Sequence, residues 1–369
     1  MQKFPIHASR RLRATPYTER VEASGLTGYT IYNHMLLPTS FGSLESDCQH
    51  LKEFVQIWDV SVERQVELRG PDAHKLAVMM SARDLSSAEP GRCYYAPVTD
   101  RNGGILNDPV ALCLAPDRYW LSIADSDLLL WALGLAVGMN LDVEVFEPDV
   151  SPLAIQGPLA VELMADVFGE EVRSLRFFRF KWFAWRGRNL VIARSGWSKQ
   201  GGFEIYLDDN SLGIQLWDDI WAKGAPYNLK PGCPNYIERI EGGLFSLGND
   251  MTREDTPLEV GLDQYVNLDS HDFIGREALR AQAKQGISKK LMGLRIDGAP
   301  LPPLAMPKDC MADGQRIGML TSAVFSPEFD TNLGFAMLDI AHAETGSEVQ
   351  VQYEAQLRNA QVCSFPFTR

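Results

Sequence analysis

The feature that most constrains the fold is a strand, a Gly-Pro turn and an apolar helix that occur twice in the same order. The first copy covers residues 66–80 with its turn at Gly70-Pro71, and the second covers residues 153–168 with its turn at Gly157-Pro158. Proline suits the first turn of a helix, because the N–H that it lacks would have no partner there. The repeated order predicts two related α+β lobes.

Each copy is followed by further strands and a second helix. In the first lobe we expect strands at 104–114 and 119–123 and a helix at 128–137; in the second, strands at 190–193 and 203–207 and a helix at 212–221. The longest apolar stretch, residues 128–139, is too short to span a bilayer and contains two glycines. It predicts a buried helix.

The last part of the chain has a different pattern. From about Lys289 it alternates short β-like runs with turn residues, at 291–296, 316–320, 334–338, 349–353 and 361–365. Short strands with regular turns predict a small β-barrel or jelly roll. The polar, basic segment 281–290 is predicted to be a linker. A chain of 369 residues is expected to divide into two or three such domains.

Composition excludes several classes of function. The net charge of −13 argues against nucleic acid and against an anionic membrane surface as partners. Six cysteines without CxxC spacing predict ordinary thiols in a reducing compartment. Six histidines without an HxxxH or HExxH pair give no reason to expect a protein-bound metal. Because no cationic start precedes an apolar run, we expect no signal peptide and a cytoplasmic protein.

Residues 194–206 form the most informative local pattern. An apolar run at 190–193 is followed by small and glycine residues, and the chain then re-enters a strand in which Glu204 lies between Phe203 and Ile205. A carboxylate in an apolar strand is costly unless a partner satisfies it. The amino-pyrimidinone edge of a pterin would be such a partner. Alternatively, this is a hairpin whose Glu204 faces water.

Residues 202–206, Gly-Phe-Glu-Ile-Tyr, resemble the folate-binding hairpin of the glycine-cleavage T-protein (aminomethyltransferase) family. Other motifs of the family match in the same order along the chain, at 103–108, 237–244, 256–262, 272–279 and 318–322. The resemblance implies an α+β protein of three domains arranged like a cloverleaf around a central folate channel. The domains would be two related lobes at 1–140 and 141–285, which could exchange segments, and a C-terminal barrel at 286–369.

Within the family, the chain is most similar to the tetrahydrofolate-dependent dimethylsulfoniopropionate demethylases. The motifs behind this narrower resemblance lie at 9–11, 15–16, 28–38, 56–60, 107–110, 194–206 and 248–254. It implies methyl transfer from the sulfonium to tetrahydrofolate, giving methylthiopropionate and 5-methyltetrahydrofolate. It also allows a homodimer.

Two other functions remain open. One is transfer from an N-methyl or aminomethyl donor, as in dimethylglycine demethylases and aminomethyltransferases. In the aminomethyl-transferring relatives, the turn that corresponds to Asn107-Asp108 usually carries two acidic residues. The other is a non-catalytic folate-binding protein, but Cys310 and Cys363 lie in no reactive-cysteine motif of that kind.

Sulfonium chemistry makes modest demands on the protein. The methyl group is already electrophilic and the thioether leaves without a proton, so the main tasks are alignment and exclusion of water. Aromatic rings suit the dispersed onium charge. Trp197, Tyr206 and Tyr32 are the candidates, although any of them could be a core aromatic. Ser198 and Lys199 are candidates to receive the substrate carboxylate.

The resemblance also implies folate-binding residues. Glu204 would hold the pterin edge, and Asp108 would position the folate, unless it is an ordinary turn carboxylate. Arg239 matches the arginine of the family's Leu-Arg-Leu-Glu-Ala-Gly run, with a surface ion pair as the alternative.

Tyr95 and Phe178 are candidates to stack on the folate rings. Tyr94 and Phe177 compete for these roles, because neighbouring strand residues face opposite ways. Asp108 and Tyr206 are the predicted catalytic residues.

Overall fold

The computed structural model describes residues 9–368, and its contacts divide the chain into two compact units. The first unit comprises Met1–Arg64, Pro148–Gly196 and Gln200–Cys233; the second comprises Gln65–Glu147, Trp197–Lys199 and Pro234–Arg369. Residues 1–8 and residue 369, the ends of the first and third predicted domains, lie outside the described residues. The linear boundaries 1–140, 141–285 and 286–369 stay predictions.

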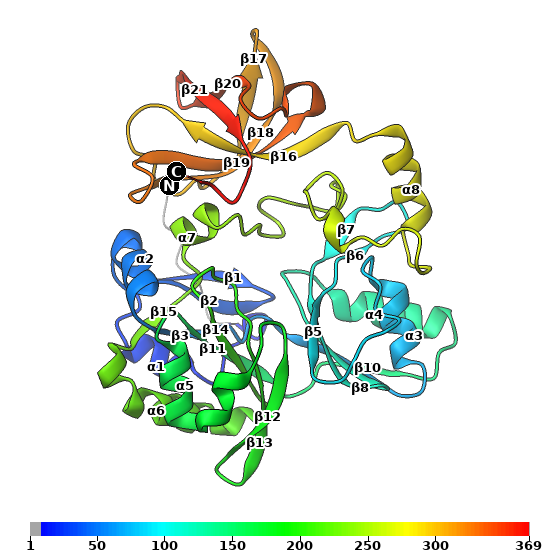
Figure 1. Ribbon diagram of the computed structural model, residues 1–369, viewed down its shortest axis with the longest axis vertical. Helices are drawn as coiled ribbons and strands as arrows, with labels where there is room; N and C mark the ends of the chain where they lie inside the picture. Colours follow the sequence, from blue (N-terminus) through cyan, green and yellow to red (C-terminus); the bar gives the residue numbers. More distant parts are fainter. Residues whose placement is uncertain (1–8, 369) are drawn as a thin grey trace. The chain divides into compact units, whose positions relative to one another are not determined.

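The first unit is built on a six-stranded sheet with the order β12-β13-β14-β11-β3-β15 (Figure 1). All neighbouring strands are antiparallel except β15, which runs parallel to β3. The strands are β3 Gln56–Asp59, β11 Ser151–Gln156, β12 Phe180–Trp185, β13 Arg188–Ala193, β14 Gly202–Leu207 and β15 Lys230–Gly232. The other elements are α1 Thr18–Ala23, β1 Gly28–Tyr32, β2 Met35–Ser40, α2 Leu44–Glu53, α5 Ala160–Phe168, η1 Glu170–Ser174, η2 Asn210–Leu212, α6 Gly213–Lys223 and η3 Ala225–Tyr227.

The two faces of this sheet differ in chemistry. Helices α5 and α6 pack on one face, where Ile57, Leu153 and Ile205 are fully buried in the main core of the unit. Since successive strand residues point to opposite faces, the neighbouring positions face the other way. There, Gln56 lies opposite Gln156, and Glu204 follows on the next strand. The sheet therefore presents a buried polar row on the face opposite α5 and α6, where α2 also packs through Leu51.

The second unit contains a five-stranded antiparallel sheet with the order β10-β4-β9-β8-β5. Its elements are β4 Gln65–Arg69, α3 Ala73–Met80, β5 Arg92–Tyr95, β8 Val110–Ala115, β9 Arg118–Ser122, α4 Leu128–Gly138 and β10 Glu144–Phe146. A short ladder joins β6 Val98–Thr99 to β7 Ile105–Asn107. Three short helices, α7 Tyr236–Glu241, η4 Asp263–Tyr265 and α8 Arg276–Gln285, precede the barrel.

The repeated strand–turn–helix unit is confirmed. Strand β4 leads through Gly70 into α3, and β11 leads through Gly157 into α5. Both glycines have a positive φ, 131° at Gly70 and 126° at Gly157, which side chains rarely adopt. The prolines precede the helices and do not lie in their first turn, since α3 begins at Ala73 after its N-cap Asp72 and α5 begins at Ala160 after its N-cap Leu159.

The two turns should differ in their tolerance of a methyl group. A Cβ at Gly157 would lie 2.2 Å from the carbonyl oxygen of Phe54, whereas at Gly70 the closest atom, the carbonyl oxygen of Asp142, lies at 2.9 Å. We expect Gly157→Ala to lower the free energy of unfolding by about 3 kcal/mol or more and Gly70→Ala by less. Urea unfolding measures this, with Gly134→Ala in α4, where a Cβ meets nothing, as the control. Equal stability of Gly157→Ala and the control would contradict the expectation.

The prediction of a buried helix at 128–139 was wrong. Helix α4 buries only Leu128, Ala132 and Ala136, while Leu130 and Val137 are 65% and 81% exposed. The stretch is apolar all round, and such a pattern is usually typical of a buried helix. Only one side of α4 meets the core of its unit.

The C-terminal part is a closed six-stranded barrel with the order β16-β19-β18-β17-β20-β21 (Figure 1), so the barrel prediction is confirmed. Its elements are β16 Lys289–Ile296, β17 Lys308–Ala312, β18 Gln315–Ser326, β19 Thr331–Asp339, η5 Ile340–His342, β20 Glu348–Tyr353 and β21 Gln356–Cys363. The sequence patterns missed β17, because lysine, aspartate and alanine have low strand propensity. The predicted linker 281–290 was also wrong, since α8 extends to Gln285 and β16 begins at Lys289.

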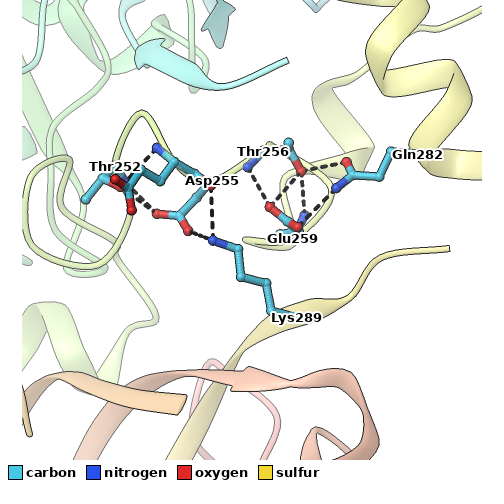
Figure 2. A network of polar contacts seen from close by, with 7 residues as sticks. Thr252, Asp255, Thr256, Glu259, Gln282 and Lys289 are labelled. Atoms are coloured by element: carbon cyan, nitrogen blue, oxygen red, sulfur yellow. Dashed lines mark hydrogen bonds and ion pairs between the residues drawn. The ribbon is translucent and has the colours of Figure 1, made fainter. Parts of the chain in front are cut away.

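A polar network fixes the chain between the family motif at 256–262 and the barrel (Figure 2). Glu259 accepts hydrogen bonds from the backbone N–H of Thr256, at 2.9 Å, and from the amide of Gln282 in α8, at 3.0 Å. The ammonium of Lys289, at the start of β16, donates to Asp255 at 2.5 Å. This motif therefore has a structural role, joining α8 to the first barrel strand.

None of the helices in residues 9–368 combines the length and apolar character that crossing a membrane requires. All six cysteines are free thiols.

Candidate functional site

The hairpin at 194–206 folds around the side chain of Gln156. The Gln156 amide donates to the carbonyl oxygen of Ser195 at 3.1 Å. Gly196 and Gly202 have φ values of 138° and 157°, and a Cβ on either would lie within 2.5 Å of the Gln156 side-chain nitrogen. The glycines are therefore required both for backbone conformation and for the close approach of this amide. The sequence patterns did not single out Gln156, although a glutamine in an otherwise apolar strand was a visible signal.

Glu204 is buried on β14, with only 5% of its surface exposed. Its Oε2 accepts hydrogen bonds from the hydroxyl of Ser195 and, at 3.3 Å, from the hydroxyl of Tyr206. Burial raises the pKa of the Glu204 carboxyl above its ordinary value. The alternative in which Glu204 faces water is thus wrong. The Glu204 carboxyl is a buried hydrogen-bond acceptor, and further hydrogen-bond donors would stabilise its charged form.

Three predicted aromatic residues lie in the first unit. Tyr206 is buried beside Glu204, and Tyr32 ends β1 with intermediate exposure. Phe178 adopts φ 57°, a region that is strained for an aromatic residue, while its backbone N–H donates to the carbonyl oxygen of Arg194 at 2.9 Å. Its ring contacts that of Phe177, which is 72% exposed, with centroids 4.7 Å apart. Phe178 is thus less exposed to solvent than Phe177. Its contact with folate stays a prediction.

The tip of the same hairpin belongs to the second unit by its contacts. Trp197 and Ser198 are partly buried, whereas Lys199 is exposed. The backbone N–H of Lys199 donates to Oε1 of Glu238 on α7 at 2.7 Å. The predicted roles of these three residues toward the substrate remain predictions.

Asn107 and Asp108 have different surroundings in the second unit. The amide of Asn107 is buried and bonds to the carbonyl oxygen of Ala124 at 3.0 Å and to the hydroxyl of Ser126 at 2.8 Å. It also accepts the backbone N–H of Ala124 at 3.0 Å. Asn107 is therefore committed to holding the turn that follows β9.

Asp108 accepts a hydrogen bond from the hydroxyl of Tyr95 on Oδ2 at 2.8 Å. Its other oxygen, Oδ1, is buried and has no hydrogen-bond partner among residues 9–368. Burial raises the pKa of Asp108 to about 7. An ordinary turn carboxylate would be solvated. The burial of Asp108 therefore indicates that a hydrogen-bond donor of a ligand binds at Oδ1.

Tyr95 was the better choice of the two neighbouring tyrosines for a position beside Asp108. The ring of Tyr94 is 5% exposed in the core, and its hydroxyl accepts the backbone N–H of Glu89 at 2.9 Å. Tyr95 points instead to Asp108 and packs edge-on against Tyr265, with ring centroids 4.8 Å apart. Tyr265 was not among the predicted site residues. Its contact with the ring of Tyr95 is what places it beside Asp108 and Tyr95.

Replacing Asp108 should change the pH dependence of stability. Because its folded-state pKa exceeds the ordinary value of 3.8, the folded protein retains a proton that the unfolded chain releases, and stability falls as pH rises between about 4 and 7. We expect Asp108→Asn to reduce this fall by a few kcal/mol at most, at about 1.4 kcal/mol per pKa unit. Urea unfolding from pH 4 to 8 measures it, with the exposed Asp117→Asn as control. Parallel profiles for wild type and Asp108→Asn would contradict it.

Arg239 lies on α7 but is not at the surface. Its guanidinium pairs with Asp250 at 2.8 Å and donates to the hydroxyl of Ser322 in the barrel at 2.7 Å. The ring of Tyr236 lies 4.4 Å below it. The alternative for Arg239 was a surface ion pair, but its ion pair with Asp250 is buried. The hydrogen bond to Ser322 links α7 to β18. A folate contact of Arg239 stays a prediction.

The helix that carries Arg239 is shorter than its pattern suggested. The residue pattern around Arg239 predicts a helix over about 235–245, but α7 covers only Tyr236–Glu241. Asn235 caps its start by accepting the N–H groups of Ile237 and Glu238. Gly243, with φ 68°, stops the helix from continuing.

The structure thus yields two groups of predicted residues, one in each unit. Glu204 and Tyr206 share the polar face of the first unit, and Tyr95 and Asp108 are hydrogen-bonded in the second. In residues 9–368, no three or more His, Cys, Asp or Glu side chains form a group that could hold a metal ion.

Two family models match the chain. Residues 17–270 match the GCVT N-terminal domain, and residues 289–368 match the glycine cleavage T-protein C-terminal barrel domain. The fold is similar to the crystal structure of glycine cleavage system aminomethyltransferase T from Bartonella henselae, with a TM-score of 0.87, 23% identity, and coverage of 97% of this chain and 98% of the other.

Curated relatives are similar over most of their length. The dimethylsulfoniopropionate demethylase DmdA of Ruegeria pomeroyi is 53% identical over 347 residues, which cover 94% of this chain and 95% of the relative. An aminomethyltransferase of Caldanaerobacter subterraneus subsp. tengcongensis is 30% identical over 322 residues, which cover 85% of each chain.

Proposed function

The chain belongs to the glycine-cleavage T-protein family, and we propose that it moves a methyl group from dimethylsulfoniopropionate to tetrahydrofolate, giving 3-methylthiopropionate and 5-methyltetrahydrofolate. The observation that carries this proposal is the 53% identity to a dimethylsulfoniopropionate demethylase over 94% of the chain. The aminomethyltransferase is similar at 30%, which favours the demethylase activity over the alternative.

The buried carboxyl groups fit a folate with N–H donors on its pterin. Oδ1 of Asp108 is a buried acceptor without a partner among the described residues, and Glu204 is an acceptor buried at 5% exposure. A buried acceptor without a partner, such as Oδ1 of Asp108, is costly unless a donor reaches it. Glu204 would hold the amino-pyrimidinone edge, and Asp108, with Tyr95, would position the ring system. When bound, tetrahydrofolate supplies a neutral amine nitrogen as the methyl acceptor.

In methyl transfer from a sulfonium, the main role of the protein is to orient the methyl donor and the acceptor nitrogen, and no proton has to be transferred at the sulfur. The leaving thioether is neutral, so no general acid is required at the sulfur. Holding donor and acceptor in line accounts for up to about 7–11 kcal/mol of the barrier. Trp197, Tyr206 and Tyr32 are the candidate rings for the onium charge, each worth about 0.5–2 kcal/mol where well placed. Ser198 and Lys199 would receive the carboxylate at the other end of the substrate.

The main alternative is a folate-dependent aminomethyltransferase or an N-methyl demethylase acting on dimethylglycine- or betaine-type donors. Transfer of an aminomethyl or methylene group requires proton transfer at nitrogen, and hence a titratable group beside the reacting atoms. Position 107 is an asparagine whose amide is committed to Ala124 and Ser126. It cannot supply a second carboxylate, which leaves Asp108 alone in the turn. This argues for the simpler methyl transfer.

The proposal also covers the partners, cellular location and oligomeric state of the enzyme. A small-molecule substrate and no nucleic acid or anionic membrane partner fit the net charge of −13. A cytoplasmic location is part of the proposal because six cysteines without CxxC spacing fit a reducing compartment. A homodimer is part of the proposal by resemblance alone.

A donor panel tests the proposed function. Purified protein and tetrahydrofolate are mixed, without oxygen, with dimethylsulfoniopropionate, dimethylglycine or glycine betaine at equal concentrations. A carrier-bound aminomethyl donor is added as a separate arm. We expect rapid demethylation of dimethylsulfoniopropionate and at least about 100-fold lower kcat/KM with the nitrogen donors, which is about 2.7 kcal/mol. A higher kcat/KM for a nitrogen donor would move the assignment to the alternative.

A further inference from the structure

Lys199 contacts helix α7 at two separate points. Its backbone N–H donates to Oε1 of Glu238 at 2.7 Å, and Glu238 is only 2% exposed. Its side-chain stem crosses Gly242, where a Cβ would lie 2.6 Å from Cγ and 3.4 Å from Cε of Lys199. One contact fixes the backbone and the other directs the side chain.

Both contacts depend on the residue types at positions 238 and 242. A leucine at position 238 would offer no acceptor to the Lys199 N–H, and an alanine methyl at position 242 would occupy the space of the lysine stem. Two separate residues, Glu238 in α7 and Gly242 at its end, therefore act on the same lysine.

Buried polar contacts fix helix α7, which carries these contacts, to the barrel. Arg239 pairs with Asp250 and reaches Ser322 of the barrel, and Glu241 accepts the hydroxyl of Ser326 at 2.5 Å. All side chains from Ile237 to Glu241 are buried. A residue held on both its backbone and its stem by such a helix loses little further entropy when it binds a ligand.

The far end of Lys199 is available for binding. The residue is exposed, and within the described part of the chain its ammonium forms no ion pair. In a chain with a net charge of −13, an anionic ligand needs a specific cation to overcome the general repulsion. An ammonium is a compact charge with rotatable donors and suits a carboxylate.

We propose that Glu238 and Gly242 are positioning residues that hold the Lys199 ammonium as the receptor for the substrate carboxylate, and thereby select methyl donors that carry a carboxylate. This inference rests on the proposed function and deepens it. Glu238 and Gly242 act through Lys199, and neither is required to touch the substrate.

The test compares variants that remove one contact of Lys199 at a time. Gly242→Ala and Glu238→Leu each remove one contact, whereas Glu238→Gln keeps an acceptor oxygen and Gly134→Ala adds the same methyl in open space on α4. We expect the first two to raise the KM for dimethylsulfoniopropionate about tenfold, equivalent to about 1.4 kcal/mol. The KM for tetrahydrofolate and kcat should stay within about twofold, and both controls should resemble wild type.

A Lys199→Met background separates positioning from a structural effect. If Gly242 acts through Lys199, then Gly242→Ala adds no further rise in KM once the ammonium is gone. A second, equal rise in that background would overturn the proposal, as would an equal rise in the KM for tetrahydrofolate.

Hydrogen–deuterium exchange of the peptide 195–203 tests the contacts without any substrate. Faster exchange in Gly242→Ala and Glu238→Leu, but not in the controls, is expected if these contacts hold the tip of the hairpin. Unchanged exchange in both variants overturns the proposal whatever the donor is. Faster exchange without a change in KM overturns the role toward the carboxylate. If wild type does not demethylate dimethylsulfoniopropionate, the proposed function fails and the carboxylate role fails with it, while exchange still decides whether the contacts exist.

Discussion

Glu204→Gln is expected to raise the dissociation constant for tetrahydrofolate roughly 10- to 100-fold, the loss of one charge-assisted hydrogen bond. The glutamine keeps the shape of the side chain and can still accept the hydroxyls of Ser195 and Tyr206, so the fold should be retained. What it loses is the charge that a pterin edge with N–H donors would use. Anaerobic fluorescence titration with tetrahydrofolate measures the change.

The matched variant is Trp197→Ala, which should weaken binding of the sulfonium more than that of folate. Wild-type folate affinity should also rise with pH as the Glu204 carboxyl ionises, because burial holds its pKa above the ordinary value, and Glu204→Gln should lack this component. Equal effects of the two variants on both ligands would refute this division of roles between Glu204 and Trp197.

Arg239→Met should cost about 3–5 kcal/mol of unfolding free energy, because it leaves the buried carboxylate of Asp250 without the cation that pairs with it. The side chains of Arg239 and Asp250 are 4% and 0% exposed, and the guanidinium also joins α7 to Ser322 of the barrel. Urea unfolding, followed by tryptophan fluorescence, measures the loss.

The barrel offers a control with similar geometry at the surface. Arg316 and Asp309 pair at 2.6 Å but are 57% and 52% exposed, so Arg316→Met should cost less than about 1 kcal/mol. In addition, Arg239→Met combined with Asp250→Asn should lose less than the sum of the single variants, since each removes the same interaction. A similar cost for Arg239→Met and Arg316→Met would show that burial of the pair does not determine its contribution.

Much of the fold was predictable because local patterns and tertiary structure agree. The Gly-Pro units predicted the right strands and helices because the positive φ at Gly70 and Gly157 is a local requirement of the turn between them. The exposed face of α4 and strand β17 were missed for the opposite reason. Burial of an apolar helix and pairing of a weakly β-forming segment are decided by what lies beside them in space.

The candidate site was predictable where the pattern was chemically costly. A carboxylate at Glu204 between apolar neighbours demanded a buried partner or water, and the structure shows burial with Ser195 and Tyr206. The roles of Gln156 and Glu238 were not predictable, because their partners are backbone groups far away in sequence. Sequence patterns do not reveal which backbone group meets a given side chain.

The most direct test of the central claim follows the methyl group itself. Dimethylsulfoniopropionate with isotope-labelled S-methyl groups is incubated with the protein and tetrahydrofolate without oxygen, and the products are analysed by mass spectrometry. The account predicts one labelled methyl group in 5-methyltetrahydrofolate for each 3-methylthiopropionate formed, both dependent on the enzyme. Label that never reaches the folate, or folate that gains a methylene group instead, would contradict it.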